Sequence, residues 1–253
     1  MAGTNEATLT TAAPRWLIRR QPRPDAAGSL YFFPHAGGSP GEYVRWSDDL
    51  PHARVWAVQL PGRGSRLHER PFTRMDPLVQ TIVEAVPFDS PCALFGHSLG
   101  GLIAFEVART LRDLGREPDR LFVSSCPPPL IRRGGTAIHL LPDAGLLAEI
   151  ERRWGALPEH VHADPGLRAL VLASHRADIE LFETYRHVPG EPLTCPLTVI
   201  AGDQERGDLD PDGWRGCTLG SFDLQILRGH HFYFRQQRHD LMRLIEETMS
   251  RDR

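Results

Sequence analysis

The sequence has no lysine, and all 29 residues in its Lys plus Arg count are arginines. Its 32 acidic residues outnumber them, so the formal net charge is −3 and the isoelectric point is near 6.5. Such a chain has no overall positive field of the kind that attracts nucleic acid. We therefore expect no nucleic-acid partner.

Cysteine is scarce as well, because the chain has only Cys92, Cys126, Cys195 and Cys217. These four residues lie far apart and form no Cys-x-x-Cys pair, so the sequence indicates neither a zinc site nor a disulfide framework. We expect no bound metal and a reduced, cytoplasmic location.

Long apolar segments are missing too, since no run approaches the roughly 20 residues that span a bilayer. Residues 1–14 are polar and lack the basic start and apolar stretch of a secretory signal. We expect them to form a disordered tail, and the protein to be soluble with no membrane partner. Residues 15–253 have the composition and length of a single domain.

Six short apolar runs, rich in β-branched and aromatic residues, are spread along the chain. They are residues 30–33, 55–58, 93–95, 121–123, 197–200 and 224–227. Most do not alternate between apolar and polar side chains, which is typical of strands buried on both faces of a parallel sheet. Because parallel strands need crossovers, we predict a mostly parallel central sheet with helices on both faces.

Helical patterns separate these runs. Apolar residues recur at helical spacing in residues 99–114, before Gly115, and again in about residues 236–249. The fourth and fifth runs are too far apart for a plain crossover. The sequence between them carries helical stripes and an Asp164-Pro165 helix start. We interpret about residues 130–190 as a helical insertion that forms a lid.

Residues 96–101, Gly-His-Ser-Leu-Gly-Gly, contain a Gly-x-Ser-x-Gly match. An apolar run precedes it and an amphipathic helical pattern follows, which is the strand–turn–helix context of a nucleophile elbow. The flanking glycines allow the strained turn that lifts a serine hydroxyl above a sheet. We predict that Ser98 is the nucleophile of an acyl-transfer reaction in an α/β-hydrolase fold. The alternative is a glycine-rich turn with a capping serine.

A serine nucleophile needs a base to take its proton and a third group to orient that base. In this fold the histidine comes last in the chain. Only His230, His231 and His239 follow the last predicted strand. His230 and His231 lie in the turn at the end of that strand, whereas His239 falls within the terminal helical pattern and is expected at the surface. Of the pair in the turn, we predict that His231 is the base.

The acid of this fold lies between the serine and the histidine, on the loop after the preceding strand. Three carboxylates compete there: Asp203, Glu205 and Asp208. An oxyanion hole also needs two backbone N–H groups. We predict that Leu99, directly after the nucleophile, supplies one and that Ala36, in the glycine-rich residues 33–39, supplies the other. The spacing of those glycines fits neither a P-loop nor a dinucleotide-binding turn.

Three segments together resemble the type II thioesterases that accompany polyketide synthases and nonribosomal peptide synthetases. They are residues 33–38 (Phe-Pro-His-Ala-Gly-Gly), 59–64 (Gln-Leu-Pro-Gly-Arg-Gly) and 96–101. Further matches follow in the family's order at residues 141–143, 176–178, 183–185, 192–196 and 229–232. The resemblance covers roughly residues 30–234.

The resemblance implies hydrolysis of acyl thioesters held on the phosphopantetheine arm of an acyl carrier protein or a peptidyl carrier protein. This reaction edits stalled or wrongly loaded assembly lines and uses no cofactor. The family pattern assigns Ser98 as nucleophile, His231 as base, and the backbone of Ala36 and Leu99 as oxyanion hole. It also makes the insertion a lid over the pantetheine and acyl channel.

Two segments depart from the family pattern. Glu205 stands where the family usually has an aspartate, and glutamate also serves as triad acid in this fold. We therefore predict Glu205 as the acid, with Asp203 and Asp208 as alternatives. In addition, residues 124–129 replace a segment that usually has Gly and Arg ahead of Ala-Pro, a change expected to reshape the acyl pocket.

Two alternative functions remain open from the sequence. One is release of the mature product of a single pathway, and the other is a catalytically weakened module that only docks on carrier proteins. Arg63, Arg66 and Arg70 could contact an acidic carrier protein, although a solvated loop is an equally good interpretation of them.

Overall fold

The protein was analysed as a computed structural model that describes residues 13–131, 137–205 and 209–251. Residues 1–12 of the expected N-terminal tail lie outside the described residues. The described chain begins with the four-residue helix α1 (Ala13–Trp16).

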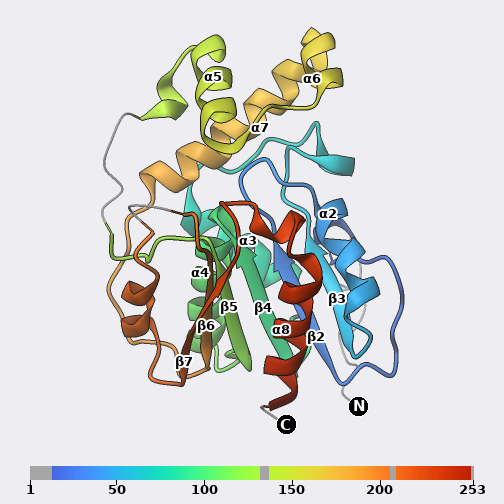
Figure 1. The fold of residues 1–253 in the computed structure, drawn as a ribbon, viewed down its shortest axis with the longest axis vertical. Helices are drawn as coiled ribbons and strands as arrows, with labels where there is room; N and C mark the ends of the chain where they lie inside the picture. The colour runs from blue at the N-terminus through green and yellow to red at the C-terminus, as the bar shows by residue number, and fades with distance from the viewer. Residues whose placement is uncertain (1–12, 132–136, 206–208, 252–253) are drawn as a thin grey trace, which may run out of the picture.

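One seven-stranded sheet forms the centre of the molecule (Figure 1). Its strands are β1 (Leu17–Ile18), β2 (Gly28–Phe33), β3 (Ala53–Val58), β4 (Cys92–His97), β5 (Arg120–Ser124), β6 (Leu197–Gly202) and β7 (Phe222–Leu227). They lie in the order β1-β3-β2-β4-β5-β6-β7, and every neighbouring pair is parallel except β1 with β3. The six apolar runs are thus confirmed as six parallel strands, and β1 was not predicted.

Burial explains why most of the apolar runs do not alternate. Every residue of β2, β4, β5 and β6 is buried, since these strands have neighbours on both edges and helices on both faces. Strand β7 lies at an edge, is only half-buried, and leaves the Ile226 side chain exposed.

Some helices cover the faces of this sheet, and others stand above one of its ends (Figure 1). After α1 they are α2 (Pro40–Val44), α3 (Met75–Ala85), α4 (Leu99–Asp113), α5 (Asp143–Trp154), α6 (Glu159–Ala163), α7 (Pro165–Thr184) and α8 (Arg238–Arg251). Short 3-10 helices are η1 (Arg45–Asp49), η2 (Gly64–Arg66), η3 (Ile138–Leu140), η4 (Pro211–Cys217) and η5 (Tyr233–Arg235).

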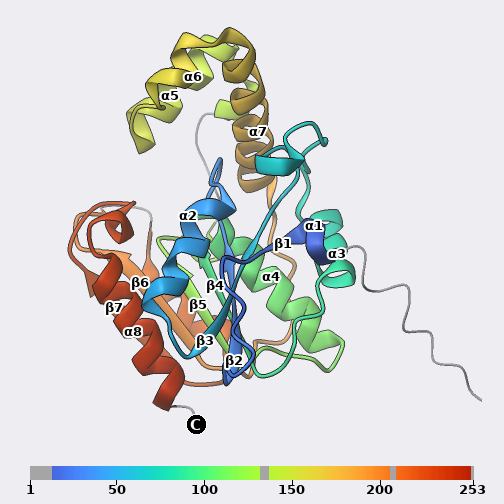
Figure 2. The same cartoon turned by 90° about the vertical axis from the view of Figure 1, so that its right-hand side faces the viewer.

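Two apolar layers hold the helices to the sheet. On one face the buried side chains of α3 and α4 join those of the strands in one cluster. On the other face α2 and α8 do the same. Figure 2 shows the two sets of helices on opposite sides of the strands. The predicted α/β architecture, with helices on both faces, is therefore confirmed.

The strand order creates a crevice at the centre of the sheet. Strand β2 pairs with β4, but the chain leaves β2 toward β3 on one side and leaves β4 toward β5 on the other. In open parallel sheets ligands bind at the carboxyl ends of two such strands, where the connections diverge. The loops that start at Pro34 and Ser98 lie at this point.

Helices α5, α6 and α7 form the helical insertion, which stands above the sheet in Figure 1. The insertion has its own apolar cluster, centred on Leu146, Ile150, Leu172 and Ile179. Helix α7 begins as predicted, because the Asp164 carboxylate accepts the N–H groups of the first turn and a proline follows it.

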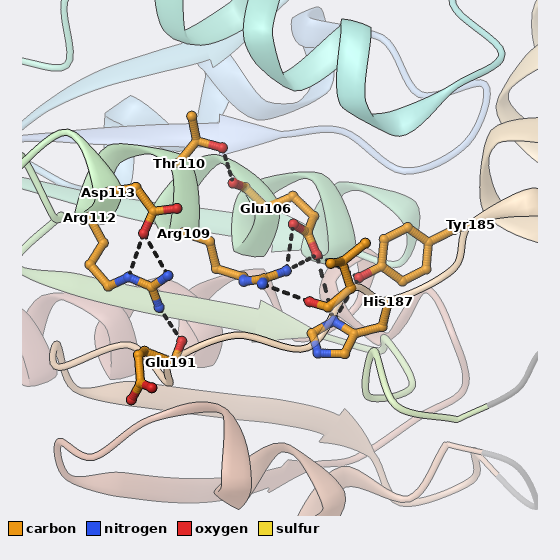
Figure 3. A network of polar contacts seen from close by, with 9 residues as sticks. Glu106, Arg109, Thr110, Arg112, Asp113, Tyr185, His187 and Glu191 are labelled. Carbon is orange, nitrogen blue, oxygen red and sulfur yellow. Dashed lines mark hydrogen bonds and ion pairs between the residues drawn. The ribbon is translucent and has the colours of Figure 1, made fainter.

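The return segment of the insertion is fixed to α4 by polar contacts (Figure 3). The Tyr185 hydroxyl donates to Glu106 over 2.5 Å, and Arg109 donates to the Val188 carbonyl over 2.7 Å. Arg112 also binds the carbonyl of Glu191. Since α4 begins directly after Ser98, these contacts connect the insertion to the helix of the nucleophile elbow.

Candidate active site

Ser98 occupies a strained turn between the last residue of β4 and the first residue of α4. Its φ and ψ are 54° and −122°, although positive φ is costly for a residue with a side chain. The Ser98 N–H donates to the Ser124 carbonyl over 2.8 Å, and the Ser98 carbonyl accepts from Gly101 over 2.9 Å. The neighbouring strand and the first turn of α4 thus hold the strained conformation.

The glycines around Ser98 are required by close contacts. A Cβ atom on Gly96 would lie 2.0 Å from the Gly100 carbonyl oxygen, and one on Gly100 would lie 2.0 Å from the Phe33 carbonyl oxygen. A Cβ on Gly101 would lie 2.9 Å from the Cβ of Cys126. Only glycine fits at positions 96 and 100, because the backbone atoms there cannot move away as a flexible side chain can.

His231 and Glu205 meet at the carboxyl ends of β7 and β6. His231 Nδ1 lies 2.9 Å from Glu205 Oε1. The other carboxylate oxygen accepts the Gly202 N–H over 2.8 Å and the Ser125 hydroxyl over 2.6 Å. The Glu205 side chain is 9% exposed and that of His231 is 25% exposed, so the carboxylate is sheltered while the imidazole can reach a substrate.

Opposing effects act on the Glu205 carboxyl. Burial by itself raises its pKa, but hydrogen bonds from His231, Ser125 and the Gly202 amide together outweigh burial and bring the pKa below its ordinary value. Glu205 is therefore ionised at neutral pH. An anion beside Nδ1 favours the tautomer in which Nδ1 carries the proton and Nε2 accepts one.

Asp203, the other candidate acid among the described residues, does not join this pair. Asp203 Oδ1 accepts the N–H of Gly229 over 2.8 Å, so its carboxylate supports the loop that carries His231 rather than the imidazole. Asp208 lies outside the described residues. Of the other late histidines, His230 is exposed, and the side chain of His239 is 88% exposed.

The two candidate oxyanion-hole amides belong to Ala36 and Leu99, which line a cavity together with Ser98. Leu99 is the first residue of α4, and a first-turn N–H has no partner within its helix. Within the part of the chain that the structure describes, no hydrogen bond uses the Ala36 N–H.

Two cavities adjoin Ser98. One has a volume of about 480 Å³ and is also lined by His231, and the other has a volume of about 350 Å³ and is also lined by Leu99. Ala36 and Trp154 line both. Trp154 belongs to α5, so the helical insertion supplies part of the wall of both cavities at Ser98.

Two further histidines lie behind the site. The ring centroid of His97 is 4.9 Å from that of His231 and 5.9 Å from that of His35. Burial is the main cause that lowers the pKa of both His35 and His97 well below 6.5, and the neighbouring cationic groups add to it. Both rings are therefore neutral at pH 7.

We expect this burial to make the protein lose stability in mild acid. The pKa of His97 is lower in the folded than in the unfolded chain, so unfolding takes up a proton as the pH falls below about 6.5. In denaturant titrations from pH 6.5 to 5, His97→Asn should reduce the slope of the unfolding free energy by up to about 1.4 kcal/mol per pH unit. His239→Asn, at an exposed position, is the control. An unchanged slope for His97→Asn would contradict this expectation.

Two of the three arginines after β3 that were considered as contacts for a carrier protein are not at the surface. Arg63 and Arg66 are buried, with 6% and 7% of their surface exposed. Arg63 pairs with Asp178 of α7, and Arg66 pairs with Glu69 and lies over the Trp16 ring. For Arg63 and Arg66 the hypothesis of a carrier contact is wrong, and so is the alternative of a solvated loop, because both side chains are buried in ion pairs within the protein. Arg70 is exposed.

Sequence reasoning also missed what Ser125 does. It follows β5 with a φ of 47° and is buried, and its hydroxyl binds the Glu205 carboxylate. The available signal was its place at the carboxyl end of a central strand, beside the loop that carries the acid. Within residues 124–129, the segment expected to reshape the acyl pocket, Ser125 also supports the carboxylate.

The described ranges contain neither a metal-binding cluster nor a membrane-spanning helix. Across residues 13–131, 137–205 and 209–251, no group of three or more His, Cys, Asp or Glu side chains is arranged to hold a metal ion. In the same ranges no helix is both long and apolar enough to cross a membrane.

A parallel sheet with a strained serine after a central strand, and a histidine and carboxylate after later strands, defines an α/β-hydrolase fold. A family model described as the thioesterase domain matches residues 29–249. The chain belongs to this thioesterase family.

Three relatives illustrate the likeness. Thioesterase PikA5 of Streptomyces venezuelae is 37% identical over 92% of this chain and 85% of that protein. Linear gramicidin dehydrogenase LgrE of Brevibacillus parabrevis is 35% identical over 93% of this chain and 92% of that protein. The structure of the type II thioesterase BorB from the borrelidin biosynthetic cluster superposes with a TM-score of 0.82 and is 34% identical. The match covers 92% of this chain and 95% of the BorB chain. LgrE is named a dehydrogenase, but this chain has no Gly-x-Gly-x-x-Gly turn for a dinucleotide.

Proposed function

We propose that this protein is an editing, type II thioesterase, which hydrolyses acyl groups from the phosphopantetheine arm of an acyl carrier protein or peptidyl carrier protein. The observation that carries the proposal is the His231–Glu205 hydrogen bond of 2.9 Å beside the strained Ser98, in a chain of the thioesterase family. Similarity to the thioesterase PikA5, and to BorB, a type II thioesterase from a biosynthetic cluster, supports this proposal.

The proposed reaction has two steps. The Ser98 hydroxyl attacks the thioester carbonyl while Nε2 of His231 takes its proton. The carbon–sulfur bond then breaks, His231 protonates the departing pantetheine sulfur, and the acyl group remains on Ser98 as an ester. Water attacks this ester with His231 again as base, which releases the carboxylic acid and restores the serine. The overall change is thioester plus water to acid plus thiol.

Charge stabilisation completes the proposed mechanism. In both steps the carbonyl oxygen becomes an oxyanion, for which the N–H groups of Ala36 and Leu99 are the proposed donors. Glu205 stabilises the imidazolium that forms on His231. Its depressed pKa supports this role, because an already ionised carboxylate needs no proton transfer to act.

We also propose that the insertion is a lid over the substrate. Support comes from the cavities of about 480 and 350 Å³ that meet at Ser98, since a thioester has two chains that diverge from its carbonyl carbon. One cavity would take the pantetheine arm and the other the acyl chain. Both sizes are ordinary for small-molecule sites.

A thioester panel tests the function. Purified protein should hydrolyse acetyl and propionyl groups from a phosphopantetheinylated carrier protein, and a fluorophosphonate probe should label it covalently. Preference for one long, mature chain over short acyl groups would instead indicate product release. Absence of both hydrolysis and labelling would indicate a module that only docks on carriers, because only an activated serine reacts readily.

A further inference from the structure

Two segments that the proposed chemistry does not use meet in the fold. Residues 60–63, Leu-Pro-Gly-Arg, follow β3, and residues 176–178, Arg-Ala-Asp, lie in α7. Arg63 Nη2 lies 2.6 Å from Asp178 Oδ1, and the two side chains are 7% and 3% exposed. Desolvating two charges is expensive and rarely the best route to stability alone. The position of this pair therefore needs another explanation.

The second oxygen of Asp178 identifies what the pair holds. Asp178 Oδ2 accepts the N–H of Gly37 over 2.7 Å, and Arg63 Nη1 donates to the Gly38 carbonyl over 3.4 Å. Both contacts are to the loop after β2, and Gly37 is the residue next to Ala36. The ion pair thus binds the backbone of the proposed oxyanion-hole loop.

That loop is a β-turn with a defined orientation of its central peptide. The Gly38 N–H donates to the His35 carbonyl over 2.8 Å, and Gly37, the third residue, has the positive φ of +70° that a type II turn requires. The central peptide of this turn joins Ala36 to Gly37. In a type I turn this peptide would be flipped, so that the Ala36 carbonyl rather than the Gly37 N–H would face Asp178. The carboxylate attracts the N–H and repels the carbonyl, so it selects the observed turn.

Helix α7 touches this turn and the neighbouring loop through one face. A Cβ on Gly37 would lie 2.0 Å from Nε2 of His175, and the Ser174 hydroxyl donates to the Gly62 carbonyl. Arg176, whose side chain lies on a different face, instead binds Asp143 over 2.6 Å and the Leu141 carbonyl over 2.7 Å. Within one short motif, then, Arg176 holds the insertion together and Asp178 connects it to the active site.

We propose that Asp178, neutralised by Arg63, is a positioning residue that holds the turn of residues 35–38 so that the Ala36 N–H faces the oxyanion. This inference rests on the proposed function and deepens it. A charged acceptor binds an amide more strongly than a neutral one. Arg63 cancels a negative charge that would otherwise oppose the oxyanion. The insertion is thereby part of the catalytic framework as well as a cover.

The test replaces the ion pair with apolar side chains of similar size. Such replacements are often neutral for stability, but Arg63→Met/Asp178→Leu leaves the Gly37 N–H without its acceptor. We expect kcat for a short acyl-carrier thioester to fall about 10- to 100-fold, part of what loss of an oxyanion-hole donor costs. KM should stay within about twofold, because the turn acts on the transition state. Wild-type kcat in this variant would overturn the inference.

Two matched variants separate positioning from loosening of the insertion. Arg63→Gln/Asp178→Asn keeps a neutral acceptor for Gly37, so it should recover most of the lost kcat, with a residual deficit of about threefold or more. Arg176→Met breaks a different ion pair of α7, one with Asp143 that does not contact the turn, and should lower kcat far less than the Met/Leu variant does. An equal loss of kcat in Arg176→Met, or no recovery in the Gln/Asn variant at equal melting temperature, would contradict positioning.

Further controls keep the two proposals distinguishable. If the Met/Leu variant fails to fold, the Gln/Asn variant decides alone: a lower kcat with unchanged KM supports the inference, and wild-type kcat overturns it. Wild-type protein that hydrolyses no thioester would remove the proposed function itself. Wild-type protein that hydrolyses thioesters, with a fully active Met/Leu variant, would remove only this inference.

Discussion

Ser98→Ala is expected to lower kcat for acyl-carrier thioesters by about 10³- to 10⁶-fold and to abolish labelling by a fluorophosphonate. The variant loses the attacking oxygen but keeps the Cβ, so the strain at a φ of 54° is nearly unchanged. Folding and KM should therefore be preserved. Steady-state hydrolysis at a high enzyme concentration and varied substrate concentration measures kcat and KM, and a thermal melt measures folding.

The control for Ser98→Ala is Ser250→Ala, at an exposed position in α8. It should match the wild type in hydrolysis, labelling and melting temperature. Substantial turnover by the Ser98 variant would mean that another group is the nucleophile, and labelling elsewhere in the chain would identify it.

Glu205→Gln is expected to lower kcat by about 10⁴-fold, with little change in KM. The amide has the size of the carboxylate but no charge, so it cannot stabilise the imidazolium, and it can present an N–H₂ group to Nδ1. Ser125→Ala should have a smaller effect of the same sign, because it removes one of the donors that hold the carboxylate. Steady-state kinetics on one carrier-bound substrate measures all of these variants.

The matched controls for Glu205 are the two competing carboxylates. Asp203→Asn should cost only a few-fold, because an amide oxygen can still accept the Gly229 N–H. Asp208→Asn should be equally mild if Glu205 is the acid. If either substitution lowered kcat more than Glu205→Gln, that aspartate would be the triad acid instead.

Much of the fold was predictable because its strands are buried on both faces. A continuous apolar run flanked by helical patterns leaves few alternatives to a parallel sheet, and all six runs became strands. The two residues of β1 were not predictable, since a segment that short shows no periodicity. It is a strand only because Leu17 and Ile18 meet β3 at the edge of the sheet.

The nucleophile elbow was equally accessible, because its requirements are local. Gly96 and Gly100 are needed where the turn brings backbone atoms together, and those atoms belong to the turn itself and to the end of the adjacent strand. Chain order reduced the histidines to His230, His231 and His239, and the family pattern then assigned His231. Chain order could not choose between Asp203 and Glu205, which lie two residues apart on one loop. The prediction of Glu205 came from the family resemblance, and in the structure the loop directs Glu205 rather than Asp203 toward His231.

By itself, the sequence predicted the class of fold, Ser98 as candidate nucleophile, His231 as candidate base and the resemblance to thioesterases, since each depends on short-range patterns, chain order or family motifs. Tertiary structure alone decided that Glu205 contacts His231, that Ser125 supports it, and that Arg63 is buried against Asp178. The pairs Ser125–Glu205 and Arg63–Asp178 are separated by 80 and 115 positions in the chain. No short-range sequence pattern predicts such a contact, because the packing of the whole sheet and the helical insertion brings the partners together.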